Sequence, residues 1–205
     1  MHIRRLVLFG VSVLIAVAGV GLLGGRLGWF VDRPIAAVRY GKASGPAMIG
    51  GPFGLVDQRG RRRSDRDFRG KRMLVFFGYT HCPDFCPTGL QTITQALRLL
   101  GADAAKLQPI FVTVDPERDT VKVLRSYAAN FHPSLIALTG STAQVAAAAR
   151  AYRVYYAKGK VDSDGDYAMA HSTYTYLMGS DGRYITHFRH GISPEALAAS
   201  LKKHL

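Results

Sequence analysis

The sequence predicts an α/β domain built on a mixed β-sheet, and three observations support that fold class. Short apolar runs suited to buried strands recur along the chain. Between them lie segments whose apolar residues are spaced as on one face of a helix. Near the end of the chain, two strand-like segments flank a Ser-Asp-Gly turn and a last helix follows. Strand–helix alternation predicts parallel strands and the terminal hairpin adds antiparallel ones, so the sheet is expected to be mixed.

The first half of the domain begins with a hairpin-like segment, residues 53–64, whose turn is expected at 58–60. Residues 72–79 (RMLVFFGY) are a short apolar run typical of a buried strand. The segment 87–100 has an apolar stripe at helical spacing and predicts a helix. Residues 109–114 (PIFVTV) then predict a second buried strand.

The second half continues the alternation and ends in the hairpin. Its expected elements are a helix at 120–130, a strand at 135–139, a helix at 142–152, and hairpin strands at 171–179 and 182–191. The last helix is expected to begin after Ser193, with Ser193 as N-cap and Pro194 at the first helical position. This order is the thioredoxin pattern, with extra elements at the front and in the middle.

The N-terminus predicts a membrane anchor within residues 1–30. From Leu6 to Gly25 there are 20 consecutive residues without a charge. A helix of that length spans the ~30 Å hydrocarbon core at ~1.5 Å per residue. Trp29 and Phe30 follow at an interfacial position. The alternative is a signal peptide cleaved after Ala18, but the apolar run continues beyond that point.

Whether residues 1–30 are an anchor or a signal peptide, the rest of the chain is expected to be exported. Arg4 and Arg5 precede the apolar run and are expected to stay in the cytoplasm by the positive-inside rule. Residues 31–51, rich in Gly, Ala and Pro, are interpreted as a linker, and residues 52–205 as the globular domain. We therefore expect a single-pass protein of the bacterial inner membrane whose domain lies in the periplasm.

A good part of the net charge of +13 lies in one segment. Residues 57–72 hold eight Lys and Arg against three Asp. No helix-turn-helix, RNA-recognition or zinc-finger pattern accompanies them, so the composition argues against nucleic-acid binding. A solvated basic loop, near anionic lipid or an acidic partner, is the preferred interpretation.

The only two cysteines, Cys82 and Cys86, are spaced C-x-x-x-C. A disulfide between them closes a loop too short to remove much chain entropy, so a functional pair is favoured over a structural one. Pro87 suits the first helical position, which predicts Cys86 as the N-cap. The pair then lies on a strand-to-helix connection, where the helix N-terminus favours thiolate over thiol. Both metal coordination and thiol exchange need a thiolate.

A selective metal site needs more than two thiolates, and histidine is the first candidate for a third ligand. Of seven histidines, His171 follows the polar segment 161–170, a loop flexible enough to carry it towards the cysteines. His81 adjoins Cys82, but on an extended backbone its side chain points the opposite way. Spacing alone leaves the third ligand, and the choice between Cu(I) and Zn, open.

Four segments, in the expected order, resemble the SCO/SenC family of copper chaperones. They are GGPFGLVDQRG (50–60), FGYTHCPDFCPTGL (77–90), FVTVDPERDT (111–120) and HSTYTYLMGSDGRY (171–184). The resemblance covers about residues 50–205. It implies a thioredoxin-like fold with an N-terminal β-hairpin extension, and one copper ion bound by Cys82, Cys86 and His171. It also implies delivery of that copper to the binuclear copper site of cytochrome c oxidase subunit II.

The resemblance has further implications. Copper is expected as Cu(I) or Cu(II), and oxidation of Cys82 and Cys86 to a disulfide couples metal loading to thiol redox. Asp115 either supports the ligands from outside or is purely structural. An upstream copper donor or thiol reductase is expected as a partner. A metallochaperone is not an enzyme; the alternative is a thiol-disulfide oxidoreductase acting on cysteines of the oxidase or of other exported proteins. A peroxiredoxin-like reaction is not favoured, because no arginine is evidently placed beside Cys82.

Overall fold

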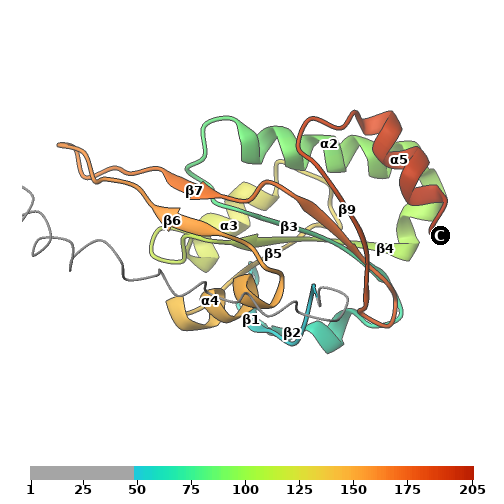
Figure 1. Cartoon of the computed structure of the whole chain (residues 1–205), viewed down its shortest axis with the longest axis horizontal. Helices are drawn as coiled ribbons and strands as arrows, with labels where there is room; N and C mark the ends of the chain where they lie inside the picture. Colours follow the sequence, from blue (N-terminus) through green and yellow to red (C-terminus); the bar gives the residue numbers. More distant parts are fainter. Residues whose placement is uncertain (1–48) are drawn as a thin grey trace, which may run out of the picture. The chain divides into compact units, whose positions relative to one another are not determined.

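A computed structural model describes residues 49–205 and confirms the predicted mixed α/β architecture (Figure 1). The strands are β1 (Gly54–Asp57), β2 (Arg62–Ser64), β3 (Arg72–Gly78), β4 (Leu107–Thr113), β5 (Ile136–Thr139), β6 (Tyr156–Lys158), β7 (Met169–His171), β8 (Thr175–Met178) and β9 (Tyr184–Phe188). The α-helices are α2 (Phe85–Leu100), α3 (Val121–Ala128), α4 (Thr142–Ala151) and α5 (Pro194–Lys202). Two short 3-10 helices, Asp65–Phe68 and Gly101–Lys106, were not expected from the sequence.

Seven strands form one sheet in the order β2-β1-β5-β4-β3-β8-β9. Strand β4 pairs in parallel with both β3 and β5, as strand–helix–strand connections require. The predicted terminal hairpin, β8–β9, and the N-terminal hairpin, β1–β2, add antiparallel strands at the two edges. The β3 strand, from which the cysteine segment continues, thus lies inside the sheet, between β4 and β8.

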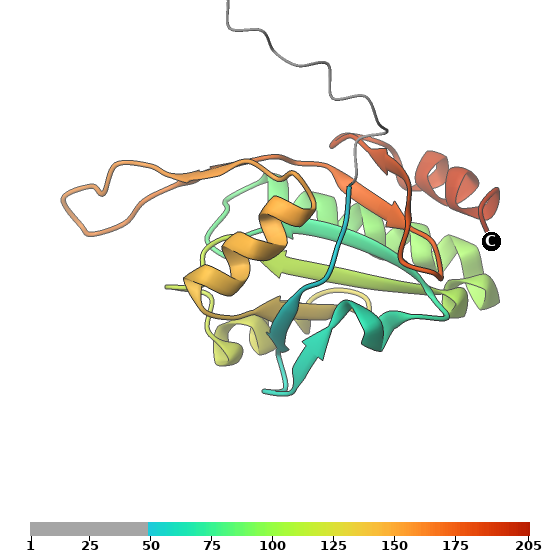
Figure 2. The ribbon, with the colours of Figure 1, turned by 60° about the horizontal axis from the view of Figure 1, so that its bottom comes forward.

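The core lies on both faces of β3, because alternate side chains of a strand point to opposite faces. On one face Phe76 packs against Phe111, under α2. On the other face Phe77 packs against Tyr152, which follows α4. Helices α2 and α5 accordingly lie together on one side of the sheet and α4 on the other (Figures 1 and 2). The predicted start of the last helix is confirmed, since Ser193 caps α5 and Pro194 is its first residue.

Strands β6 and β7 form a separate two-stranded sheet, called here the hairpin arm (residues 156–171). Figures 1 and 2 show it projecting from the body of the domain. The polar segment read as a loop does form the loop of this hairpin over residues 161–168, but residues 169 and 170 belong to β7, and the pairing of β6 with β7 was not predicted. Two strands of three residues have no room to display a period-two pattern, which explains why the arm was missed.

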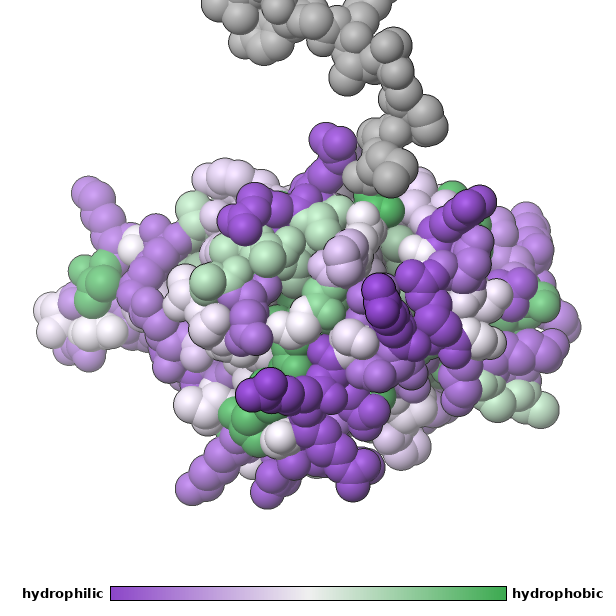
Figure 3. Space-filling model, turned by 90° about the horizontal axis from the view of Figure 1, so that it is seen from below, coloured by the Kyte–Doolittle hydropathy of each residue, from purple (hydrophilic) through white to green (hydrophobic). Residues whose placement is uncertain are grey.

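The basic segment is solvated, as expected. The side chains of Arg59, Arg61, Arg62 and Arg66 are exposed, and Arg63 pairs with Asp57 of β1. Hydrophilic groups are prominent on the face of the domain that carries β1, β2 and α4 (Figure 3). The predicted anchor (1–30) and nearly all of the predicted linker (31–51) lie outside the described residues. Within residues 49–205, no helix has the length and apolar character needed to cross a membrane.

Candidate metal centre

The structure brings Cys82, Cys86 and His171 together. One donor atom from each, the two Sγ atoms and an imidazole nitrogen, can be chosen so that all three lie within 4.8 Å of one another. Both cysteines are free and buried, and His171 is half-buried. Within the part of the chain that the structure describes, this is the one cluster of at least three Cys, His, Asp or Glu side chains able to hold a metal ion.

The two cysteines come from the connection between β3 and α2. Cys82 lies in the thiol loop (residues 79–84), and its Sγ accepts a hydrogen bond of 3.4 Å from the backbone N–H of Cys86. Cys86 is the second residue of α2, and Asp84 is the N-cap, so the expectation that Cys86 caps the helix was wrong. Pro87 disfavours but does not forbid a helical conformation at the preceding residue. Its missing N–H falls in the first turn, where no intrahelical partner exists anyway.

The electrostatics of Cys86 differ from the expectation that the helix N-terminus favours its thiolate. The Cys86 side chain is completely buried, and burial raises the pKa of its thiol well above the usual range. Hydrogen bonding from the Tyr79 backbone acts in the opposite direction but is outweighed. In the metal-free protein Cys86 is therefore a thiol, and a metal ion that binds its sulfur must displace a proton.

His171, the last residue of β7, presents the correct nitrogen to the thiols. Its Nδ1 lies 2.9 Å from the backbone carbonyl of Ser172, which can only accept, so Nδ1 carries the proton. The unprotonated Nε2 faces Cys86, 3.4 Å from its Sγ. Burial lowers the pKa of His171, which keeps the imidazole neutral and able to donate its lone pair to a metal. The imidazole and the Tyr79 ring pack in a T-shaped arrangement, with centroids 5.8 Å apart.

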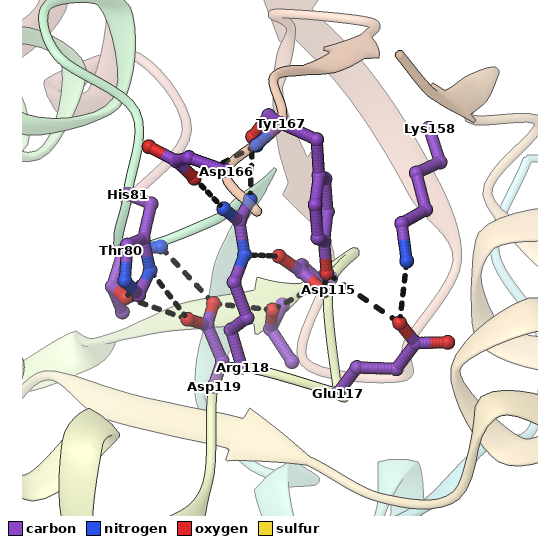
Figure 4. Close-up of polar contacts among 10 residues, drawn as sticks. Thr80, His81, Asp115, Glu117, Arg118, Asp119, Lys158, Asp166 and Tyr167 are labelled. Atoms are coloured by element: carbon purple, nitrogen blue, oxygen red, sulfur yellow. Dashed lines mark hydrogen bonds and ion pairs between the residues drawn. The ribbon is translucent and has the colours of Figure 1, made fainter. Parts of the chain in front are cut away.

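Asp119 fixes the start of the thiol loop. Its buried carboxylate accepts hydrogen bonds from the backbone N–H and the hydroxyl of Thr80, at 3.0 and 2.6 Å, and one from Thr113 at 2.6 Å. His81 lies towards this carboxylate, with its Nδ1 3.9 Å away (Figure 4). It is not a member of the donor cluster, in agreement with the expectation from its position beside Cys82.

Asp115 lies in a neighbouring network, where it contacts Arg118 and Tyr167 (Figure 4). Because Tyr167 belongs to the hairpin arm, Asp115 connects the β4–α3 loop to the element that carries His171. The sequence interpretation missed Arg118, Tyr167, Tyr79 and Asp119. The available signal was that Tyr79, Arg118 and Asp119 stand inside the motifs that carry the family resemblance, beside residues that were singled out.

Gly78, at the end of β3, leaves the space that Cys86 occupies. A Cβ atom at position 78 would lie 2.7 Å from the Sγ of Cys86 and 2.9 Å from the ring of Phe111. We expect Gly78→Ala to lower the free energy of unfolding by about 1–3 kcal/mol, the usual cost of overpacking a core. Thermal unfolding of the metal-free protein measures the effect.

A matched control for that substitution is Gly54→Ala. Gly54 also lies on a strand, and a Cβ there meets nothing within 4 Å. Its unfolding temperature is expected to stay close to that of the unsubstituted protein. Equal unfolding temperatures for the two variants would contradict the close packing of Cys86 against Gly78.

The donor set determines which chemistry the cluster supports. Two thiol sulfurs and one imidazole nitrogen match a soft or borderline metal ion, and they leave a coordination position free for another ligand. The two sulfurs are also close enough to form a disulfide with each other after modest movement of the loop, as thiol-disulfide exchange requires. The geometry is thus compatible with both hypotheses drawn from the sequence.

Comparison with known proteins places the chain among relatives. The family model described as SCO1/SenC matches residues 41–205. The human mitochondrial SCO2 homologue is 42% identical over 194 residues, which cover 90% of this chain and 73% of the human protein. A SCO2-like protein of Rickettsia prowazekii is 37% identical over 193 residues, 94% of each chain.

A solved structure agrees with these matches. The structure of Bradyrhizobium japonicum ScoI with copper bound superposes with a TM-score of 0.72 at 48% identity, covering 77% of this chain and 99% of the other. The domain therefore has the predicted thioredoxin-like fold in the form that these proteins share. By the extent of the family match and the identity to these relatives, this chain belongs to the SCO1/SenC family.

Proposed function

We propose that this protein is a copper chaperone that binds one copper ion through Cys82, Cys86 and His171. Its copper is delivered to the binuclear copper site of cytochrome c oxidase subunit II. The observation that carries the proposal is the convergence of the three donors, from a loop, a helix and the hairpin arm, in a member of this family. The copper-bound ScoI relative supports the choice of metal.

Copper is the cargo in this mechanism, and each protein group has a stated task. Cys82 and Cys86 supply the soft sulfurs that Cu(I) prefers, and binding releases their protons. His171 supplies a neutral imidazole nitrogen, which also suits Cu(II). Since three protein donors leave a coordination position open, a ligand from the acceptor can join before a chaperone ligand leaves. Copper then passes between proteins by ligand exchange. No covalent bond of a substrate changes, and the chain acts as a metallochaperone rather than as an enzyme.

The location proposed for this transfer follows from the leader. Residues 1–30 anchor the chain as a single helix in the bacterial inner membrane, residues 31–51 link it to the domain, and residues 52–205 lie in the periplasm. The uncharged run Leu6–Gly25 supports this assignment. The partners are subunit II of the oxidase and an upstream copper donor or thiol reductase. Asp115 supports the site indirectly, because it contacts Tyr167 of the hairpin arm that carries His171.

The second candidate function is thiol-disulfide exchange on cysteines of the oxidase or of other exported proteins. The observation that favours it is the pair of free cysteines, with Sγ atoms no more than 4.8 Å apart. Burial raises the pKa of Cys86 and so disfavours that residue as the attacking thiolate, which leaves the attack to Cys82, while the copper-bound ScoI relative favours metal binding. We therefore place the exchange activity second.

Replacing His171 by alanine separates the two candidates. We expect His171→Ala to weaken copper binding by at least tenfold, because one of three donors is lost, and outer partners alone are worth roughly 10–100-fold in metal affinity. The rate of reaction of Cys82 and Cys86 with a small disulfide is expected to stay within about threefold, since both thiols remain. Anaerobic titration of the reduced protein with Cu(I), against a chelator of known affinity, measures the first quantity.

The matched control is His81→Ala, which removes a histidine adjacent to Cys82 whose ring lies towards Asp119. Its copper affinity is expected to equal that of the unsubstituted protein. If His171→Ala keeps the copper affinity of the unsubstituted protein and thiol exchange persists, the oxidoreductase proposal replaces the chaperone proposal.

A further inference from the structure

The position of His171 depends on the hairpin arm, which is not part of the main sheet. Among the described residues, β6 and β7 pair only with each other, three residues against three. A two-stranded hairpin of this length is marginally stable by itself in water. The contacts between the arm and the body of the domain must therefore decide where the imidazole lies.

Arg118 makes the most extensive of these contacts, and Figure 4 shows it at the centre of the network. From the loop between β4 and α3, its guanidinium donates to the carboxylate of Asp115 on the body. The same guanidinium donates to the Asp166 carboxylate and, at 2.9 Å, to the backbone carbonyl of Tyr167 on the arm. One side chain thus bridges body and arm with separate nitrogens, which the planar five-donor fork of arginine allows.

Aromatic rings extend the bridge towards the metal centre. The guanidinium carbon lies 3.6 Å from the centroid of the Tyr167 ring, a cation–π contact on the arm. It also lies 5.8 Å from the centroid of Tyr79, whose ring packs against that of His171 in a T-shaped arrangement. The hydroxyl of Tyr167 donates to Asp115 at 2.9 Å, a further contact between arm and body.

Burial makes this network more than a surface ion pair. Asp115 is 3% exposed and the side chain of Arg118 is 17% exposed, so neither group is fully screened by water. By contrast, a second ion pair that touches the arm, Lys158 with Glu117, is exposed on both sides. Exposed pairs of that kind contribute little to stability.

We propose that Arg118 is the positioning residue of the metal centre, holding the hairpin arm against the body through Asp115, Asp166 and Tyr167 so that His171 faces the two thiols. It does not ligate the metal, and its effect on copper passes entirely through His171. This inference rests on the proposed copper site. It extends that proposal by naming the residue on which the third ligand depends.

The test is a double-mutant cycle in the full-length protein, with Arg118→Met and His171→Ala and with copper affinity as the readout. Arg118→Met alone is expected to lower the affinity by roughly 10–100-fold, the range for partners that orient a ligand. In the His171→Ala background the same substitution is expected to change the affinity by no more than about twofold, because its route of action is already gone. Electron paramagnetic resonance of the Cu(II) form is expected to show reduced nitrogen coupling in Arg118→Met.

The control is Lys158→Met, which removes the other cation over the Tyr167 ring, 4.0 Å from its centroid, and leaves the bridge to Asp115 intact. Its affinity and nitrogen coupling are expected to match those of the unsubstituted protein. Because Arg118→Met leaves the buried Asp115 carboxylate without its cationic partner, Asp166→Ala serves as a second variant. It removes an exposed group of the same bridge, and its smaller loss is also expected to vanish in the His171→Ala background.

The outcomes separate this inference from the proposed function. Equal losses with and without His171 would mean that Arg118 acts on the thiols or on folding, and would overturn the positioning role. Unchanged affinity in both Arg118→Met and Asp166→Ala would do the same. If His171→Ala itself binds copper normally, the proposed three-donor site fails, and the cycle reports that directly.

Discussion

Replacing Cys86 by serine is expected to abolish tight copper binding while the domain stays folded. The side chain of Cys86 is completely buried beneath the thiol loop, and its sulfur is the donor that faces the Nε2 of His171. Serine is close in size to cysteine, so the buried position stays filled. A hydroxyl oxygen is a hard, neutral donor, however, and a poor ligand for Cu(I).

In Cys86→Ser the expected loss of copper affinity exceeds the roughly 10–100-fold caused by removing a residue that only hydrogen-bonds to a metal ligand. Competition against a Cu(I) chelator measures it, and thermal unfolding of the metal-free protein checks that the fold persists. Cys82→Ser is the companion variant, because Cys82 supplies the other sulfur and its Sγ accepts the N–H of Cys86. Retention of copper affinity within about tenfold in either variant would remove that cysteine from the ligand set.

Oxidation of the thiol pair is expected to lower the copper content of the protein from one ion per chain to none. Formation of a Cys82–Cys86 disulfide transfers two electrons to the oxidant, a small disulfide such as oxidised glutathione, which takes up the two thiol protons as it is reduced. Both sulfur donors then disappear together, leaving His171 alone. The sulfurs lie no more than 4.8 Å apart, so the bond requires only local movement of the thiol loop.

The measurement is copper stoichiometry after gel filtration, on protein whose thiols have been counted before loading. Addition of a dithiol reductant is expected to restore full loading. Cys86→Ser provides the control, since it lacks the second thiol and cannot form the intramolecular disulfide. A verified intramolecular disulfide with one tightly bound copper would contradict both the ligand assignment and its coupling to redox state.

The fold was largely predictable because its elements bury apolar stripes with clear periods. Strands β3 and β4 are almost wholly buried, and the last helix begins after its capping residue, Ser193. The start of α2 was placed two residues late, since the rule that disfavours a helical residue before proline is a preference that packing overrides. The hairpin arm escaped prediction because three-residue strands show no period.

The metal centre was only partly predictable. Cys82 and Cys86 are local in sequence, and their spacing alone singled them out. His171 is 85 residues from Cys86, so no spacing rule connects them; the polar loop before it made it a candidate, and the family resemblance selected it. The pKa of Cys86 was mispredicted because its burial, which outweighs the helix N-terminus, is a property of the packed domain. Arg118 contacts residues 48 and 49 positions away, which only the fold brings together.

The most direct test of the central claim is X-ray absorption spectroscopy of the full-length reduced protein loaded with one equivalent of Cu(I). The three-donor site of Cys82, Cys86 and His171 predicts two sulfur neighbours and one nitrogen neighbour at the copper. It also predicts that His171→Ala removes the nitrogen and keeps both sulfurs. A spectrum with sulfur neighbours alone, or one that His171→Ala leaves unchanged, would contradict the claim.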